Sequence, residues 1–239
     1  MCIKKYIFFF FLLRAAFVPP ARCQVAEADM ITFIPSARQK VQLFWKDEQG
    51  RILGSLGNVK SFTERKKQRL VFAMNGGMYM EDRSPLGLFI QEGKIIRKLN
   101  TGTGYGNFYL RPNGIFYITV AGKGQVCTTT GYKPGKDIAY ATQSGPMLVI
   151  DGKIHPAFKK GSVNVFVRNG VGILPDGGML FAMSKKEVNL YDFAEYFQRK
   201  GCRNALFLDG FVSRTYLPAL QWLQTDGYFG VIIGATEPM

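Results

Sequence analysis

The sequence predicts an α+β fold, a strand-rich single domain in which a mixed sheet is covered by one clear helix. Two observations predict it. Along most of the 239 residues, short apolar, β-branched or aromatic runs alternate with turns that contain Gly, Pro or Asn, which is typical of strands. Residues 190–200 instead carry apolar side chains at helical spacing. A chain of this length can enclose an apolar core without metals or disulfides.

Ten apolar runs are the strand candidates. They are residues 41–45, 70–74, 86–91, 108–110, 115–120, 147–150, 171–174, 179–183, 205–208 and 231–233. Three turns place glycine where a positive φ is inexpensive, which indicates hairpins and antiparallel pairing. These turns are Glu92-Gly93, Asp151-Gly152 and Pro112-Asn113-Gly114.

The clearest helix is predicted over residues 190–200. Asn189 can cap its start and Gly201 can end it. The helix lies between the predicted strands 179–183 and 205–208, and a right-handed crossover of this kind makes its two strands parallel. That unit is the reason why a mixed sheet is predicted. A second helix is expected within residues 61–69.

Residues 1–23 predict a signal peptide. Basic residues precede an apolar run that is too short to span a bilayer, and small residues at positions 21 and 23 indicate a cut before Gln24. A lipid-linked Cys23 fits less well because Arg22 precedes it, and an uncleaved anchor is the other alternative. We therefore expect an exported chain, periplasmic or secreted, without a transmembrane segment in its mature form. Residues 24–69 would then form an N-terminal strand and connecting segment, followed by a domain over residues 70–236.

The chain is basic. Its formal charge is +14, and the predicted signal peptide contains four basic residues and no acidic one, so +10 would remain. A basic surface favours anionic partners such as phosphate, an acidic glycan or an envelope polymer. No nucleic acid partner is expected, because the aromatic residues lie in apolar strand-like runs rather than among exposed basic residues. The only histidine is His155, next to a hairpin, which excludes sites built on histidine pairs and favours a surface turn.

Cys127 and Cys202 are the two cysteines beyond the predicted signal peptide. In an oxidising compartment they can form a disulfide if their Cα atoms lie close enough. Two buried free thiols are the alternative.

Polar turns beside apolar strands carry the candidate functional side chains. Asp209 directly follows the apolar residues 205–208, at the strand end where side chains commonly meet ligands. A carboxylate there has lost hydration, so it either has a functional role or is stabilised by hydrogen bonds from local turn amides. Arg168 can offer a bidentate fork to phosphate or carboxylate. The remaining candidates, each a binding residue or a routine turn, are Asn75, Gly76, Gly77, Asn107, Asn113, Gln143, Ser144, Gly145, Asn169, Gly210 and Ser213.

Taken in order, five segments resemble the phosphodiester glycosidase domain family, the relatives of N-acetylglucosamine-1-phosphodiester α-N-acetylglucosaminidase, and most of all its small exported bacterial branch. The segments are residues 72–79, 112–116, 141–146, 167–172 and 207–210, and the resemblance spans residues 70–235. It implies a hydrolase that cleaves the bond between a sugar's anomeric carbon and a phosphodiester oxygen, with an N-acetylglucosamine-type sugar as one option. The family often continues its Asp-Gly with further Gly and a Ser. Here Phe211-Val212-Ser213 depart from that pattern, which puts the pocket floor and the substrate in question.

The resemblance and the residue chemistry together predict roles. Asp209 would activate water or stabilise an oxocarbenium ion, and Arg168 would hold the phosphate charge. One carboxylate is enough in this scheme because a phosphate monoester is a stabilised leaving group that needs little acid assistance. Backbone amides near Gly76, Gly77 and Gly145 would assist Arg168, and the side chains that bind sugar hydroxyls or orient Asp209 would be Asn75, Asn113, Gln143 and Asn169.

Two other classes of protein fit the same residues. One is a non-catalytic module that binds phosphate-bearing envelope glycans, and the other is a structural envelope protein with a basic adhesive surface. No motif requires a cofactor. Turns rich in Asn, Gln and Asp could bind a hard cation such as calcium, although no ligand spacing demands one.

Overall fold

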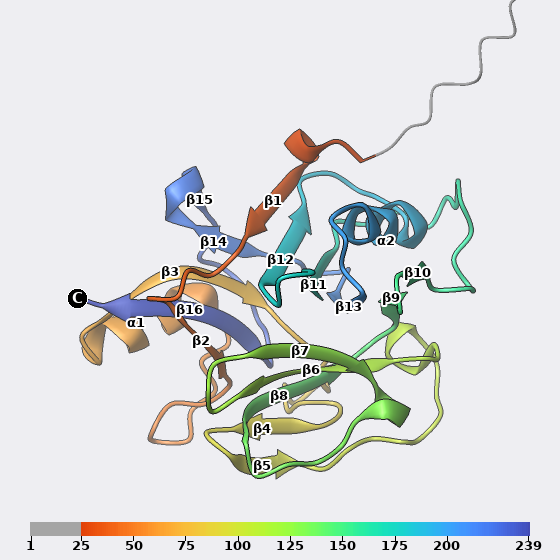
Figure 1. The fold of residues 1–239 in the computed structure, drawn as a ribbon. Helices are drawn as coiled ribbons and strands as arrows, with labels where there is room; N and C mark the ends of the chain where they lie inside the picture. The colour runs from red at the N-terminus through yellow and green to blue at the C-terminus, as the bar shows by residue number, and fades with distance from the viewer. Residues whose placement is uncertain (1–24) are drawn as a thin grey trace, which may run out of the picture.

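The computed structural model describes residues 25–239, which form three β-sheets and two α-helices (Figure 1). The predicted signal peptide lies outside the described residues. None of the described helices is long and apolar enough to cross a membrane. The prediction of a strand-rich fold is confirmed, and the proportion of sheet is higher than expected, so that the fold is mostly β.

The first sheet has six strands and contains the predicted strand–helix–strand unit. Its order is β1 (Met30–Phe33), β12 (Met179–Ser184), β11 (Asn169–Ile173), β13 (Asn204–Asp209), β9 (Met147–Ile150) and β10 (Lys153–Ile154). All of these neighbouring pairs are antiparallel, so the prediction of a mixed sheet is wrong. β12 and β13 do point the same way, as their crossover requires, but β11 lies between them and is antiparallel to both.

Helix α2 (Leu190–Arg199) covers one face of this sheet and packs against β9 and β10 (Figure 1). It begins where the sequence predicts, because the Asn189 side chain accepts a hydrogen bond from the Asp192 N–H at 2.9 Å. Its buried face packs Phe193 and Phe197 into a cluster with Phe207 of β13. The predicted helix is therefore confirmed, and it ends one residue earlier than expected.

The second sheet has five strands, in the order β15 (Trp222–Leu223), β14 (Thr215–Leu217), β3 (Gln68–Asn75), β16 (Ile232–Pro238) and β2 (Lys40–Phe44). Helix α1 (Leu56–Arg65) packs against β3 and β16. The second helix predicted within residues 61–69 thus begins earlier and ends sooner. Ser55 caps it by accepting from the Asn58 N–H, and the positive φ of Lys67 turns the chain into β3.

The third sheet also has five strands, in the order β5 (Lys94–Arg97), β4 (Phe89–Gln91), β8 (Ile138–Ser144), β6 (Gly114–Thr119) and β7 (Gly124–Thr128). The hairpin at Glu92-Gly93 is confirmed here, as is the one at Asp151-Gly152 between β9 and β10. The strand predicted at residues 108–110 is wrong, because Asn107–Tyr109 form a 3-10 turn. The turn at Asn113-Gly114 therefore joins no hairpin.

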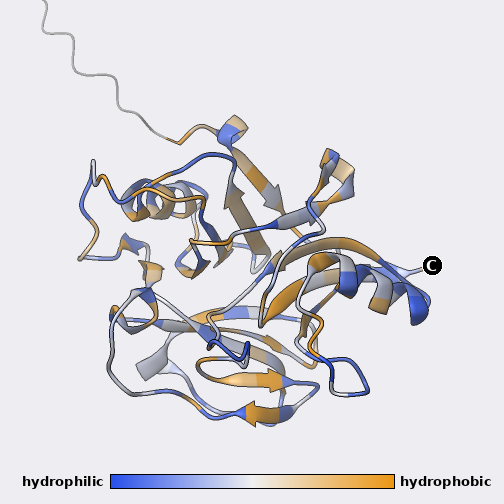
Figure 2. Ribbon diagram, turned by 180° about the vertical axis from the view of Figure 1, so that it is seen from behind, coloured by the Kyte–Doolittle hydropathy of each residue, from blue (hydrophilic) through white to orange (hydrophobic). Residues whose placement is uncertain are grey.

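One apolar core joins the three sheets. Phe181 of β12 lies at its centre, with ring centroids 5.3 Å from Phe72 of β3 and 5.7 Å from Phe116 of β6. In Figure 2 much of the apolar colour falls on the strands, while the connecting loops are mostly polar. β1 and β2, from the segment 24–69, pair with β12 and β16, so that segment takes part in the same fold.

Cys127 and Cys202, the cysteines within the described residues, are free thiols in the structure, so the hypothesis of a disulfide between them is not supported. Cys202 packs among the residues beneath α2, whereas Cys127 lies in β7 against a separate apolar cluster. Burial raises the pKa of Cys127 to about 11 and that of Cys202 to about 12.

Replacing Phe181 by Ala should lower the free energy of unfolding by about 3–5 kcal/mol, because it leaves a cavity where all three sheets meet. Urea unfolding followed by circular dichroism measures the change. Phe211→Ala is the matched control, since that ring is 84% exposed and its removal should alter stability by less than about 0.5 kcal/mol. Equal losses in both variants would contradict this account of the core.

Candidate functional site

Asp209 ends β13, after the buried apolar residues 205–208. Its register partner across the sheet is Asn169, the first residue of β11. The Asp209 N–H donates to Asn169 Oδ1 at 2.8 Å. The C-terminal end of β13 is therefore fixed against the N-terminal start of β11, and Asp209 is held at this end of the first sheet.

Asn75, the last residue of β3 in the second sheet, contacts the end of β13 in the first sheet. Its Nδ2 donates to Asp209 Oδ2 at 2.9 Å. Its Oδ1 accepts from Asn169 Nδ2 at 3.0 Å and from the Arg214 N–H at 2.8 Å. Asn169 Nδ2 also donates to the Asn75 carbonyl oxygen. The three side chains Asn75, Asn169 and Asp209, here called the Asn–Asp junction, thus connect two sheets through polar contacts.

The loop after Asp209 wraps around its carboxylate. The Phe211 N–H donates to Asp209 Oδ1 at 3.0 Å. Ser213 Oγ lies 3.2 Å from the Asp209 carbonyl oxygen and 3.1 Å from that of Val167, both of which can accept its hydrogen. Ser213 therefore ties the residue before Arg168 to Asp209, and its hydroxyl is already used inside the protein.

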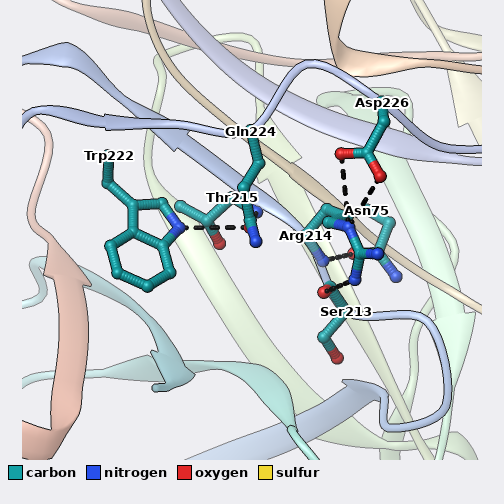
Figure 3. A network of polar contacts seen from close by, with 7 residues as sticks. All are labelled: Asn75, Ser213, Arg214, Thr215, Trp222, Gln224 and Asp226. Atoms are coloured by element: carbon teal, nitrogen blue, oxygen red, sulfur yellow. Dashed lines mark hydrogen bonds and ion pairs between the residues drawn. The ribbon is translucent and has the colours of Figure 1, made fainter.

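Arg214 continues this support outward, as Figure 3 shows. Its backbone N–H holds Asn75, while its guanidinium pairs with Asp226. In the same view Gln224 Oε1 accepts from Trp222 Nε1 and from the Thr215 N–H. The strand that follows the loop is thereby held in place beside Asn75.

Burial raises the pKa of Asp209 above its ordinary value. Desolvation is the largest cause, and hydrogen bonds from the backbone amides of residues 210–212 and from Asn75 oppose it by favouring the charged form. A carboxyl group whose pKa is moved toward the working pH is a stronger base when ionised and exchanges protons more readily.

Arg168 lies on the other side of Gly210. A Cβ added to Gly210 would be 2.5 Å from the Phe207 ring and 3.1 Å from Arg168 Nη1, so glycine lets this backbone pass close to both side chains. Arg168 Nε donates to the Val188 carbonyl oxygen, and Nη2 donates to the carbonyl and side-chain oxygens of Asn164. Nη1 has no hydrogen-bond acceptor among residues 25–239.

The guanidinium of Arg168 is buried without a carboxylate partner among the described residues. It lies between the rings of Phe166 and Phe207, at 5.4 and 5.6 Å from their centroids. Desolvation lowers the pKa of Arg168 to about 10, which still leaves it charged at neutral pH. A buried cation of this kind is well suited to bind an anion.

Several predicted site residues make internal bonds instead. Gln143 Oε1 accepts from the N–H groups of Leu88 and Asn100, and its Nε2 donates to the Asn100 carbonyl. Ser144 Oγ donates to the Leu208 carbonyl, and Asn113 Nδ2 donates to that of Phe108. These contacts give the three side chains a structural role, and substrate binding by them stays a prediction.

The predicted glycines differ in whether their N–H groups are free and in how closely other atoms surround them. The Gly76 N–H donates to the Val231 carbonyl, so this amide is not free for a phosphate. Gly77 has a φ of 94°, and a Cβ there would be 2.2 Å from Thr142 Oγ1. Gly145 lies against Asn113 and the Phe108 carbonyl. Asn107 instead lines a cavity of about 200 Å³, together with Asn164, the partner of Arg168.

The charge of Asp209 also acts on Tyr79, a residue to which the sequence analysis assigned no role. Desolvation raises the pKa of its hydroxyl, and the negative charge of Asp209 adds to the effect, which places this ring within electrostatic reach of the carboxylate. Its OH donates to the Tyr228 carbonyl at 3.2 Å, and the Arg83 guanidinium stacks on the Tyr228 ring at 3.6 Å. Its position in the segment that begins Asn75-Gly76-Gly77 was the available signal.

His155 is buried, so the prediction of a surface turn is wrong. Its Nδ1 accepts from the Ala157 N–H, its ring stacks on Phe158, and desolvation lowers its pKa. Within residues 25–239 no group of three or more His, Cys, Asp or Glu side chains is arranged to hold a metal ion.

Comparison with known proteins gives the family of this chain. Residues 68–228 match the phosphodiester glycosidase family. The chain is 36% identical over 187 residues to the uncharacterized protein YigE of Escherichia coli K12, which covers 77% of this chain and 73% of that protein. The chain therefore belongs to the phosphodiester glycosidase family, as the sequence segments predicted.

Solved structures share the fold. The catalytic domain of zebrafish N-acetylglucosamine-1-phosphodiester α-N-acetylglucosaminidase, auto-inhibited by its pro-peptide, is similar with a TM-score of 0.53 and 17% identity, covering 89% of this chain and 90% of that one. A hypothetical protein from Synechocystis is similar with a TM-score of 0.56 and 13% identity, covering 90% of this chain and 61% of that one. At these identities the likeness concerns the fold alone.

The stability of the protein should depend on pH through Asp209. The pKa of Asp209 is higher in the folded than in the unfolded protein, so its protonated form adds to the free energy of unfolding. This stabilisation is fully present below the unfolded pKa of about 3.9 and is lost as pH rises through the folded pKa. Asp209→Asn does not titrate, so its stability relative to the wild type should increase as pH rises over that interval. Urea unfolding of both proteins at stepped pH measures the difference. Parallel curves would contradict the raised pKa.

Proposed function

We propose that this protein is a hydrolase that cleaves the bond between the anomeric carbon of a sugar and the phosphate of a sugar-1-phosphodiester. The observation that carries the proposal is the buried Asp209 carboxyl, held by Asn75 and by the amides of the loop after β13, with the buried Arg168 guanidinium beside Gly210 in the same loop. Membership of the phosphodiester glycosidase family supports it. N-acetylglucosamine-type sugars are the first substrates to test, and export to the periplasm or outside the cell is part of the same proposal.

The proposed reaction uses Asp209 as the base. Its ionised carboxylate removes a proton from water, the water oxygen bonds to the anomeric carbon, and the bond from that carbon to the phosphate oxygen breaks. The electron pair leaves with the oxygen, so the products are a free sugar and a phosphate monoester. As charge develops on the sugar ring, the nearby carboxylate also stabilises it.

Arg168 supplies the anion site in this proposal. Two of its nitrogens are engaged by Val188 and Asn164, which fix the orientation of the guanidinium, while Nη1 keeps a free donor beside Gly210. A phosphate there would receive a charge-assisted hydrogen bond in a site of low polarity. Asn75 and Asn169 act as positioning residues, because they bond the carboxylate and backbone of Asp209.

Asp209→Asn should reduce kcat by about 10²–10⁴-fold, because an amide cannot accept the proton of water. The assay is release of reducing sugar from methyl N-acetylglucosamine 1-phosphate, a minimal phosphodiester, by the full chain. Asp176→Asn makes the same change on the exposed turn between β11 and β12, at the far end of β11 from Asn169, and should retain full activity. Arg168→Lys should mainly raise KM, since a lysine ammonium cannot keep the bonds to Val188 and Asn164 that orient the cation.

A variant Asp209→Asn that keeps most of its kcat would overturn the assigned role. Saturable binding of the phosphodiester by the wild type without any product would instead favour a non-catalytic module that binds phosphate-bearing glycans. The segment Phe211-Val212-Ser213, which departs from the family pattern, is the reason to measure binding alongside turnover.

The pH profile gives an independent test. If ionised Asp209 is the base, kcat/KM should rise with pH along an acid limb whose midpoint lies above the usual Asp value of about 3.9. Asn75→Ala removes a hydrogen bond that favours the charged carboxylate, so it should move this limb to higher pH. An unmoved limb would show that another group controls the profile.

A further inference from the structure

Two exposed aromatic rings lie beside the candidate site. Phe211 is 84% exposed and Phe166 is 37% exposed, and their ring centroids are 6.2 Å apart with an angle of 54° between the planes. Val163 is 93% exposed and Val165 is 36% exposed, in the segment that leads to Phe166. Apolar surface gathered in this way is unfavourable in water unless it serves to bind something.

The aromatic pair, Phe166 and Phe211, is built onto the backbone that holds the candidate site. The Phe211 N–H donates to Asp209 Oδ1, so its ring starts from the turn that carries the carboxylate. The Phe166 ring lies 5.4 Å from the Arg168 guanidinium carbon. Phe166 and Val188 exchange two backbone hydrogen bonds, and Arg168 Nε donates to the same Val188 carbonyl.

Charge and polarity together define a ligand. Arg168 presents a buried cation with a free donor, which selects an anion, while the neighbouring rings carry no hydroxyl and form no polar contact. A ligand that satisfies both has an apolar group next to its anionic one. A sugar ring that stacked its C–H face on these rings would leave its hydroxyls in water, whereas an apolar chain buries its surface against both rings.

We propose that Phe166 and Phe211 form a subsite for the alcohol side of the phosphodiester, and that this alcohol is an apolar chain. The substrate class is then an amphiphile, a sugar joined through phosphate to a lipid-like alcohol. This inference rests on the proposed function, in that it names the group on the far side of the phosphate from the scissile bond.

The experiment compares three esters of N-acetylglucosamine 1-phosphate, made with methanol, with octanol and with the 6-hydroxyl of glucose, all below the micelle concentration of the octyl ester. For the wild type, kcat/KM should be at least about tenfold higher for octyl than for methyl, since each methylene that is fully buried can add about fourfold. Phe211→Ser should reduce this ratio to about two or less, and Phe211→Leu, which keeps an apolar group, should retain most of it. Val120→Ser, at an exposed position after β6, should leave the ratio unchanged.

Equal rates with the octyl and methyl esters, or an octyl preference that survives in Phe211→Ser, would overturn the inference while leaving the proposed hydrolase intact. A preference for the glucose ester that depends on Phe211 would also overturn it, by making the pair a sugar platform. If no ester is cleaved, the proposed function fails, and calorimetric binding of the octyl and methyl esters then tests the subsite separately. Tighter binding of the octyl ester that Phe211→Ser abolishes would support the subsite, whereas equal binding of the octyl and methyl esters would contradict it.

Discussion

The hydrogen bonds of Asn75 are the constraint on which the candidate site depends. One side chain contacts the carboxylate of Asp209, the side chain of Asn169 and the backbone of Arg214, and so it joins the ends of two sheets and the loop after β13. An amide can do this because it offers donors and an acceptor at once, whereas a carboxylate in its place would face Asp209 with a second negative charge. Without these hydrogen bonds, the ends of β3, β11 and β13 would lose the polar contacts that hold them together.

Burial sets the chemistry of the two charged groups. Desolvation raises the pKa of the Asp209 carboxyl and lowers that of the Arg168 guanidinium, so both are less stable as ions than they are in water. The protein compensates for this with fixed dipoles, namely backbone amides around Asp209 and carbonyl oxygens around Arg168. Dipoles that are already oriented need not rearrange when a substrate charge arrives, which is the usual source of electrostatic catalysis.

Polar residues of the family segments divide into those that bond other parts of the protein and those that the proposed function assigns to the substrate. Gln143 and Ser144 bond backbone groups of other segments, including the Leu208 carbonyl just before Asp209, and in this way they hold the third sheet against β13. Asp209 and Arg168 are the two residues to which the proposed function assigns contacts with the substrate. A buried polar side chain needs partners in either case, so residue type alone does not separate a structural residue from one that binds substrate.

Local features were predictable from the sequence. Helix α2 is encoded by apolar spacing and by the Asn189 cap, and the hairpins at Glu92-Gly93 and Asp151-Gly152 by glycine at positions of positive φ. The family segments contain Asp209, Asn75 and Asn169, which the structure joins by hydrogen bonds, and Arg168, whose side chain bonds Val188 and Asn164 instead. Each of these signals lies within a few residues of chain, where backbone geometry and short-range hydrogen bonding decide the outcome.

Tertiary structure decided the rest. The antiparallel sheet arises because β11 inserts between β12 and β13, a pairing that no local pattern encodes, and β8 and β14 gain their stability from strands distant in the chain. The burial of His155, the effect of the Asp209 charge on Tyr79 and the free thiols depend likewise on which surfaces pack together. The sequence by itself determined the cap of α2, the hairpin turns at Glu92-Gly93 and Asp151-Gly152, and which polar residues end the strands of the family segments. Only the fold decided strand order, burial and ionisation, because these are properties of contacts between residues far apart in the chain.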